Sequence, residues 1–261
     1  MTRIIAVANQ KGGVGKTTTS VNLAASLAAA KRRVLLVDLD SQGNATMGLG
    51  VDKNALTLTA RDVLLEKCTP QAAIQHLSAL SLWLLPANLD VTEAEIKLRE
   101  MPVGDFALKS ALAEVADQFD YILLDCPPAL SKLTVNALVA ADGVLIPMQC
   151  EYYALEGLAA LTDTIGKIRK VINPRLDIEG ILRTMFDPRN NLANDVSAQL
   201  TQHYGDKVYR TLIPRNVRLA EAPSFGQPII AYDPQSSGAR AYLALAGEVL
   251  RRHDGGQLKL A

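Results

Sequence analysis

A glycine-rich string between a short apolar run and a long alanine-rich segment is the most informative feature of this sequence. The apolar run covers residues 3–8, and the alanine-rich segment covers residues 17–30. Between them stands Lys-Gly-Gly-Val-Gly-Lys-Thr-Thr, from Lys11 to Thr18. A strand, a glycine-rich loop and a helix, in that order, form the context in which such a string binds phosphate groups. The string therefore predicts a phosphate-binding loop (P-loop).

The residue types in this loop suit the phosphates of a nucleotide. Glycines let backbone N–H groups approach phosphate oxygens, and a helix that begins here adds its positive N-terminal end. We expect Lys16 to neutralise charge on the β- and γ-phosphates, and the Thr17 hydroxyl to bind Mg²⁺. The first glycine of the usual pattern is missing, and Asn9 or Gln10 stands near its place. The residues predicted to bind the phosphates are Lys11, Gly12, Gly13, Val14, Gly15, Lys16, Thr17 and Thr18.

Short runs rich in Val, Ile and Leu alternate with helical patterns along the chain. Such runs are typical of strands buried on both faces of a parallel sheet. Strands are predicted at residues 3–8, 33–37, 82–85, 121–124, 144–147, 178–185 and 207–213. Helices are predicted at residues 17–30, 58–67, 91–99, 105–118, 133–141, 155–171, 192–204 and 237–253. The alternation predicts an α/β fold, a single-domain P-loop NTPase with a mostly parallel twisted sheet and helices on both faces.

Composition limits the classes of protein to consider. Of the 261 residues, 49% are hydrophobic and 21% are charged, as in ordinary globular domains. We expect one P-loop domain over residues 1–253 and a flexible tail at 254–261, because no linker or repeat divides the chain. The formal net charge is zero, so binding to nucleic acid or membrane would need a local patch. No apolar stretch reaches the length of about 18 residues that spans a membrane.

The three cysteines, Cys68, Cys126 and Cys150, are widely separated and form no Cys-x-x-Cys pair. This spacing argues against a disulfide framework or a metal site within one chain. We expect small buried thiols in a protein of the reducing cytosol.

Three aspartates follow predicted strands at their carboxyl ends. Asp38 and Asp40 come after the strand at 33–37, and Asp125 comes after the strand at 121–124. Carboxyl ends of parallel strands meet at one edge of the sheet, beside the phosphate loop. Because Mg²⁺ on a nucleotide takes hard oxygen ligands, directly or through water, Asp125 is the predicted Walker B residue. The alternative for each aspartate is a carboxylate that caps a helix or a turn.

Lys11 and several longer strings together resemble a known family. A second lysine at the start of the loop is the mark of the deviant Walker A motif of the ParA/MinD superfamily. The strings at 150–157, 184–189 and 213–224 resemble those of the Soj-like ParA partition ATPases, and the likeness covers nearly the whole chain. The resemblance implies that Lys11 reaches the nucleotide of a partner subunit in an ATP-bound sandwich dimer. The alternative is a solvated loop lysine.

The resemblance also implies roles for residues beyond the loop. Asp40 would hold the attacking water in the first switch region, and Asp40 and Asp125 would reach Mg²⁺ through water. Asp38 would support the loop or the shell around Mg²⁺. The family segment usually has Pro after the second aspartate, and this chain has Ser41, so we expect a looser backbone there. Adenine would be framed by Met185, Pro214, Arg215 and Asn216, for which plain loop packing is the alternative.

A basic surface is suggested by the last third of the chain. Residues 183–252 contain nine Lys or Arg against six Asp or Glu. Such an excess can be a solvated face, but the family resemblance favours contact with DNA phosphates, which carry no sequence information. The predicted DNA-binding residues are Arg189, Arg218, Arg240, Arg251 and Arg252, and Arg218 is the foremost of them.

The function implied by the resemblance is that of an ATP-dependent DNA-partitioning ATPase. It would hydrolyse ATP with Mg²⁺ slowly, bind double-stranded DNA nonspecifically as a dimer, and be stimulated and released by a ParB-like protein. It would be cytoplasmic and associated with the nucleoid. One alternative is a MinD-like membrane-surface positioning ATPase, although the apolar stripe of the predicted helix at 237–253 suits core packing and the tail is short and polar. Another is a P-loop enzyme related to nitrogenase iron protein, whose cluster needs paired cysteines.

Overall fold

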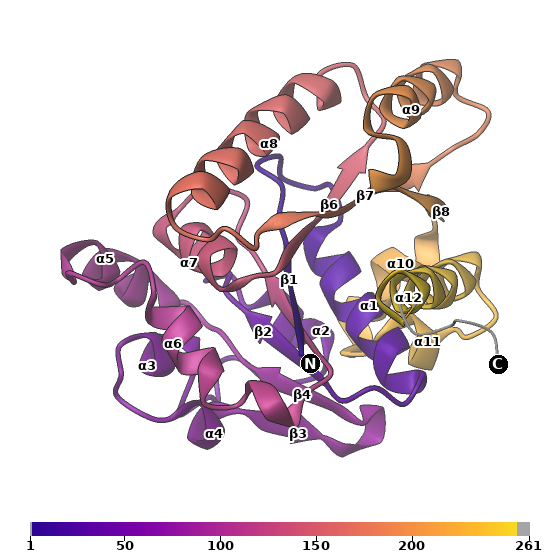
Figure 1. The fold of residues 1–261 in the computed structure, drawn as a ribbon. Helices are drawn as coiled ribbons and strands as arrows, with labels where there is room; N and C mark the ends of the chain where they lie inside the picture. Colours follow the sequence, from indigo (N-terminus) through magenta and orange to yellow (C-terminus); the bar gives the residue numbers. More distant parts are fainter. Residues whose placement is uncertain (1, 255–261) are drawn as a thin grey trace, which may run out of the picture.

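Within residues 2–254, which the computed structural model describes, eight strands form one sheet (Figure 1). They are β1 Arg3–Val7, β2 Val34–Asp38, β3 Gln75–Leu77, β4 Leu82–Leu85, β5 Tyr121–Asp125, β6 Gly143–Gln149, β7 Asp177–Phe186 and β8 Val208–Pro214. Their order is β3-β4-β2-β5-β1-β6-β7-β8, and every neighbouring pair is parallel except β3 and β4. The sheet is therefore mostly parallel, and β3 and β8 are its edge strands.

Helices connect the strands and cover both faces of the sheet. The α-helices are α1 Lys16–Ala29, α2 Asn44–Gly48, α3 Ala60–Leu64, α4 Pro70–Ala73, α5 Val91–Glu100, α6 Ala107–Ala113, α7 Lys132–Ala140, α8 Ala154–Val171, α9 Asn191–Tyr204, α10 Val217–Glu221, α11 Ile229–Tyr232 and α12 Ser237–Asp254. Short 3-10 turns are η1 Ser78–Leu80, η2 Ala116–Gln118, η3 Gly205–Lys207 and η4 Ala222–Phe225. One face packs against α1, α11 and α12, and the other against α3 and α5 to α9 (Figure 1).

The predicted fold class is confirmed, and the differences lie in short elements. The helix predicted at 105–118 is wrong in extent. From Ala111 onward the backbone hydrogen bonds join residues three apart, as in a 3-10 helix, and the segment ends in η2. This turns Phe119 into the core, where its ring meets Trp83 edge to face at 5.6 Å. The short elements β3, α2, α10 and α11 are not predicted, since they are too short to show a hydrophobic period. The predicted tail lies outside the described residues, apart from Asp254, which ends α12.

The parallel register brings the ends of three strands to one place. Val7 at the end of β1 and Asp38 at the end of β2 both align with Asp125 at the end of β5. The loop that follows β1 leads directly into α1. The sheet therefore presents the phosphate loop and the predicted carboxylates at the same edge, as ligand sites in α/β folds are arranged.

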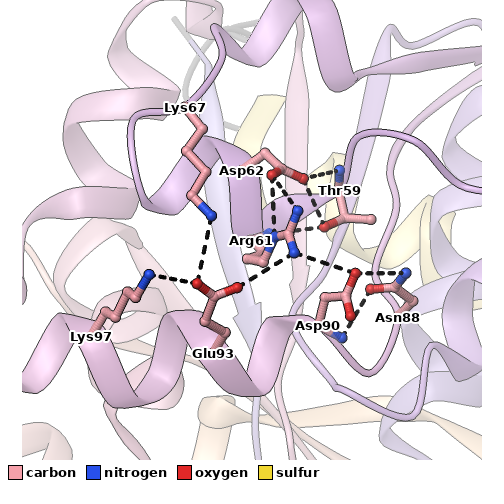
Figure 2. Close-up of polar contacts among 8 residues, drawn as sticks. All are labelled: Thr59, Arg61, Asp62, Lys67, Asn88, Asp90, Glu93 and Lys97. Carbon is pink, nitrogen blue, oxygen red and sulfur yellow. Dashed lines mark hydrogen bonds and ion pairs between the residues drawn. The ribbon is translucent and has the colours of Figure 1, made fainter.

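A cluster of charged side chains holds the loop after β4 (Figure 2). Arg61 on α3 contacts three carboxylates, those of Asp62 at 2.7 Å, Asp90 at 3.4 Å and Glu93 at 3.4 Å. Asp62 also accepts a hydrogen bond from the backbone N–H of Thr59, whose hydroxyl caps α3. Arg61 therefore ties α3 to α5 and to the loop between β4 and α5.

We predict that Arg61→Ala lowers the free energy of unfolding by about 1–3 kcal/mol, because the buried Asp62 loses its charged partner. Urea unfolding followed by circular dichroism measures the change. Lys97→Ala is the matched control, since Lys97 is half-exposed and pairs with Glu93 one turn away on the same helix. Its effect should be several-fold smaller. Equal effects of the two substitutions would contradict a cross-linking role for Arg61.

Candidate functional site

The loop between β1 and α1 has a backbone suited to bind an anion. Gly13 and Gly15 have φ angles of 73° and 86°, in the left-handed region that favours glycine. Gly15 is the N-cap of α1 and supplies no side-chain cap, so the first N–H groups of the helix stay available. Thr184 at the end of β7 donates a hydrogen bond of 2.8 Å to the carbonyl of Val14. The loop is thus anchored to the sheet and keeps its donors free for phosphate.

Gln10 occupies the position of the first glycine in the usual pattern, and Asn9 directly precedes it. The side-chain amide of Asn9 donates to the carbonyl of Pro147 on β6 at 2.8 Å, and its side-chain oxygen accepts from the backbone N–H of Lys11 at 3.0 Å. Asn9 therefore fastens the start of the loop to the neighbouring strand.

Lys16 lies in the middle of the loop. Its ammonium group donates to the carbonyl of Lys11 at 2.9 Å, and the residue is only 7% exposed. Burial lowers the pKa of Lys16, while the carboxylates of Asp125 and Asp40 act in the opposite direction. These contacts place the positive charge among the loop carbonyls and the carboxylates at the sheet edge, where a phosphate chain held by the loop would need it.

Asp38 is buried and fully hydrogen-bonded. Its carboxylate accepts from the backbone N–H of Asp40 at 3.1 Å, and from the N–H and hydroxyl of Thr46 at 2.9 and 2.8 Å. The Thr46 hydroxyl in turn accepts from the backbone N–H of Ala87, in the loop that Arg61 helps to hold. Asp38 therefore has a supporting role, since it joins the start of α2 to the sheet edge.

Asp125 is buried and only half satisfied. One carboxylate oxygen accepts a hydrogen bond of 2.7 Å from the hydroxyl of Ser20, and the other is buried with no hydrogen-bond partner. Burial, reinforced by the carboxylate of Asp38, raises the pKa of Asp125, and the hydroxyls of Ser20 and Thr17 act against this rise.

The residues around Asp125 fit a hydrated divalent cation. A buried carboxylate oxygen without a partner is costly, and a cation or its water would relieve that cost. Thr17 supplies a second hard oxygen within reach of Asp125, and Mg²⁺ takes its other ligands from substrate phosphates and water. No group of three or more His, Cys, Asp or Glu side chains suited to a metal occurs in residues 2–254. A site of this kind needs none, since nucleotide and water complete it.

Asp40 follows in a short turn and is half-buried. Its carboxylate accepts from the backbone N–H of Gln42 at 3.0 Å, and its carbonyl accepts from Gly43 at 2.9 Å. The electrostatic influence of Asp40 reaches Lys16. The turn thus keeps a carboxylate near the phosphate loop.

The side chain of Lys11 leaves its own loop and pairs with Glu151, just after β6, and both side chains are about half exposed. Tyr152 and Tyr153 follow Glu151 and are 74% and 73% exposed. Lys11 therefore belongs to an exposed surface beside the loop and not to the interior that Lys16 occupies.

The predicted adenine residues line one cavity. Met185, Pro214, Arg215 and Asn216 line a space of about 340 Å³, which Gly15 and Thr18 also line. Met185 has a φ of 49°, a strained conformation for a residue with a side chain, and its sulfur accepts a hydrogen bond of 2.7 Å from Gln149.

Sequence reasoning missed other residues of this site. Tyr242 lines the same cavity, and its hydroxyl lies 3.1 Å from that of Thr19. Its place in the apolar stripe of α12 indicated only core packing. Ser20 and Thr46, which hold the two buried aspartates, carried no sequence signal at all.

The five predicted DNA-binding arginines differ in what surrounds them. Arg189 pairs with Asp187 at 2.8 Å, and Arg218 pairs with Glu221 at 2.9 Å and with Asp233 at 3.5 Å. These two remain at the surface with their charges partly compensated.

Arg252 is turned inward. Its guanidinium donates to the carbonyls of Glu179 and Val208, pairs with Glu248 and lies 4.1 Å over the ring of Tyr209. These contacts favour a structural role for Arg252. Arg240 and Arg251 are exposed and have no ion pair or hydrogen bond with another side chain of residues 2–254. The structure thus leaves two of the five open to solvent without a partner.

Other expectations concern the cysteines and the membrane. Cys126 and Cys150 are buried, as predicted, and Cys68 is partly exposed. Burial raises the pKa of the Cys150 thiol to about 11, so this thiol is unreactive at neutral pH. No helix within residues 2–254 combines the length and apolar character needed to cross a bilayer.

Comparisons with known proteins show the family of the chain. A model of the AAA domain family matches residues 2–178. The sporulation initiation inhibitor protein Soj of Bacillus subtilis is 52% identical over 249 residues, 95% of this chain and 98% of Soj. The chromosome partitioning protein ParA of Myxococcus xanthus is 51% identical over 250 residues, 96% of this chain and 88% of ParA.

A solved structure extends the comparison to the whole fold. Cobyrinic acid a,c-diamide synthase from Mycobacterium smegmatis, with bound ATP analogue and magnesium, superposes with a TM-score of 0.86 at 39% identity and covers 98% of both chains. Relatives above 50% identity extend over nearly the whole chain, and the chain has the phosphate loop, the second lysine and the strand-end aspartates in one place. It therefore belongs to the ParA/Soj family of P-loop partitioning ATPases.

Proposed function

We propose that this protein segregates DNA by an ATP-controlled cycle of dimerisation and DNA binding. The observation that carries the proposal is the position of Lys11, whose side chain leaves its own phosphate loop for an exposed surface beside it. A lysine placed there is suited to meet a nucleotide held by a second copy of the chain. The family relationship supports the same cycle.

ATP would be bound by the loop from Lys11 to Thr18, with adenine in the cavity beside Met185 and Asn216. Thr17 and the free oxygen of Asp125 would hold Mg²⁺, Asp125 through water. When bound, Mg²⁺ neutralises charge on the phosphate oxygens. Lys16 adds a fixed positive charge from within the loop.

Hydrolysis would be an in-line attack of water on the γ-phosphate, without a covalent enzyme intermediate. Asp40 would accept a hydrogen bond from this water and orient it, and it would also reach the shell of Mg²⁺ through water. Lys16 and the Lys11 of the second copy would neutralise the charge that develops on the phosphoryl oxygens. Because Asp40 sits in a turn that Ser41 leaves without proline, we expect slow hydrolysis until a partner orders the turn.

The ATP-bound dimer would bind double-stranded DNA through arginines, among them Arg189, Arg218, Arg240 and Arg251. Contacts with phosphates alone make such binding independent of sequence and strongly dependent on salt. A ParB-like protein would stimulate hydrolysis and release the DNA. We place this activity in the cytoplasm, on the nucleoid.

The alternative is a MinD-like ATPase that binds a membrane surface. A membrane helix needs a free apolar face. In α12 the apolar residues Tyr242, Leu245, Ala246 and Val249 are buried against the sheet. This packing favours DNA over membrane.

The central test measures binding of a mixed-sequence duplex by fluorescence anisotropy, with ATP, ADP or no nucleotide, across a salt series. We expect binding with ATP only, and an affinity that falls steeply as salt rises. Arg218→Ala should weaken DNA binding and leave ATP-driven dimerisation intact. Nucleotide-independent binding, or ATP-dependent sedimentation with anionic vesicles in place of DNA binding, would favour another function.

Two variants separate the roles of the dimer and the water. Asp40→Ala should bind ATP, remain dimeric and turn over roughly 100-fold or more slowly, because its water is not oriented. Lys11→Ala should bind ATP and remain monomeric. Light scattering with ATP measures the mass, and phosphate release measures turnover. Near-normal turnover by Asp40→Ala would show that another residue holds the water.

Ser20→Ala tests the cation site through the residue that orients Asp125. We expect roughly 10-fold weaker binding of Mn²⁺ in the presence of ADP, measured by electron paramagnetic resonance, because Asp125 loses the Ser20 hydroxyl that orients it. Ser20→Thr should restore the affinity.

Ser26→Ala is the control, since Ser26 is a buried serine of the same helix whose hydroxyl has no hydrogen-bond partner. Nucleotide affinity without metal should be the same in all three variants. Equal losses of Mn²⁺ binding in Ser20→Ala and Ser26→Ala would indicate a general packing defect.

A further inference from the structure

A hollow of about 600 Å³ lies at the β8 edge of the molecule, between η3, β8 and α12. Its charged lining residues are Arg183, Asp206, Arg210, Glu248, Arg251 and Arg252. Four arginines thus face two carboxylates in one depression, although the chain as a whole is neutral. A local excess of this kind attracts anions.

Glu248 is already compensated within the protein. Its carboxylate accepts hydrogen bonds from the backbone N–H groups of Arg210 and Thr211 at 2.9 and 3.0 Å, and from the Thr211 hydroxyl at 2.8 Å. It also pairs with Arg252 at 3.1 Å. Both carboxylate oxygens of Glu248 already accept from these donors, so they do not require the guanidinium of Arg210 as a further donor.

Two of the arginines are fixed in the wall of the hollow. Arg183 donates to the hydroxyl of Ser197 and to the carbonyl of Tyr209, both at 2.7 Å. Arg252 donates to backbone carbonyls and stacks on Tyr209. Carbonyl and hydroxyl oxygens do not cancel a positive charge, so Arg183 raises the potential of the hollow, whereas the charge of Arg252 is offset by its ion pair with Glu248.

The other two arginines are open to solvent. The side chains of Arg210 and Arg251 are exposed and make no ion pair or hydrogen bond with another side chain in the described part of the chain. Asp206 is the one carboxylate of the lining that no hydrogen bond or ion pair engages within residues 2–254. Among the described residues, the charged groups of the hollow without a partner are therefore two guanidinium groups and one carboxylate.

The surface of α12 continues from the hollow. Arg240 precedes Arg251 by eleven residues, three turns of helix, so both lie on one face about 16 Å apart. Ala244 and Gly247 lie between them on that face and have little or no side chain to obstruct a polymer. The spacing suits an extended chain of phosphates, and a single small anion could not contact both ends.

We propose that this hollow binds backbone phosphates of double-stranded DNA, with Arg210 and Arg251 as contacts and Arg240 continuing the path along α12. The inference rests on the proposed DNA-binding function and adds Arg210 to its residues. The guanidinium fork matches phosphate oxygens. Since no base edge is involved, the hollow contributes affinity without sequence preference.

The test uses the full chain with ATP and a mixed-sequence duplex, with anisotropy measured across a salt series. Arg210→Ala and Arg251→Ala should each weaken binding several-fold, and each should reduce the slope of log K against log salt by about 0.9, one phosphate contact. Asp206→Asn should strengthen binding, because it removes the opposing charge. ATP-driven dimerisation, followed by light scattering, should be unchanged in all three.

Lys170→Ala is the control, since Lys170 is an exposed cation near the end of α8 without an ion pair among the described residues. It removes the same charge away from the hollow and should leave the slope unchanged. If Lys170→Ala matches Arg210→Ala, or if the hollow variants bind like the wild type, the phosphate site is overturned while DNA binding stands. A wild type that binds no duplex with ATP would overturn the proposed function as well.

Discussion

Two buried carboxylates at the edge of a parallel sheet are the constraint around which this molecule is arranged. Asp38 and Asp125 end neighbouring strands and align in the register. Burial raises the pKa of both carboxyl groups. The carboxylate of Asp38 adds to the rise at Asp125, and the carboxylate of Asp40 adds to the rise at Asp38. Two adjacent negative charges away from water require cations. Lys16 supplies one from the loop, and the unpartnered oxygen of Asp125 is the place where a second would bind.

The two aspartates connect the site to different parts of the fold. The hydroxyl of Thr46 donates a hydrogen bond to Asp38 and accepts one from the backbone N–H of Ala87. The turn after β2 is therefore joined to the loop that Arg61 holds (Figure 2). The same turn leads through α2 to Gly50, which packs against Gly226 so closely that a Cβ on either would collide with backbone atoms. That contact adjoins η4 and α10, so the segment that follows Asp40 packs against the segment that carries Arg218.

Sequence reasoning located the core of the site because sheet geometry dictates it. Lys16, Thr17 and Asp125 could be placed, since a loop after one strand and a carboxylate after another must meet at a parallel edge. The contacts that orient the side chains of the site could not be predicted. They join residues far apart in the sequence, or they involve residue types that are common on any helix. The pairing of Lys11 with Glu151 spans 140 residues, and Ser20 is one of several hydroxyls on α1.

The basic surface also depends on contacts that cannot be predicted from the sequence. Counting charges selected Arg252, yet its neighbours draw it inward over Tyr209. The same count did not single out Arg210, whose availability depends on Glu248 being compensated by backbone N–H groups. An arginine is free to bind phosphate only when the fold gives the nearby carboxylates other donors. Net charge along a sequence therefore indicates that a basic surface exists, while the hydrogen bonds of its acidic residues determine where it lies.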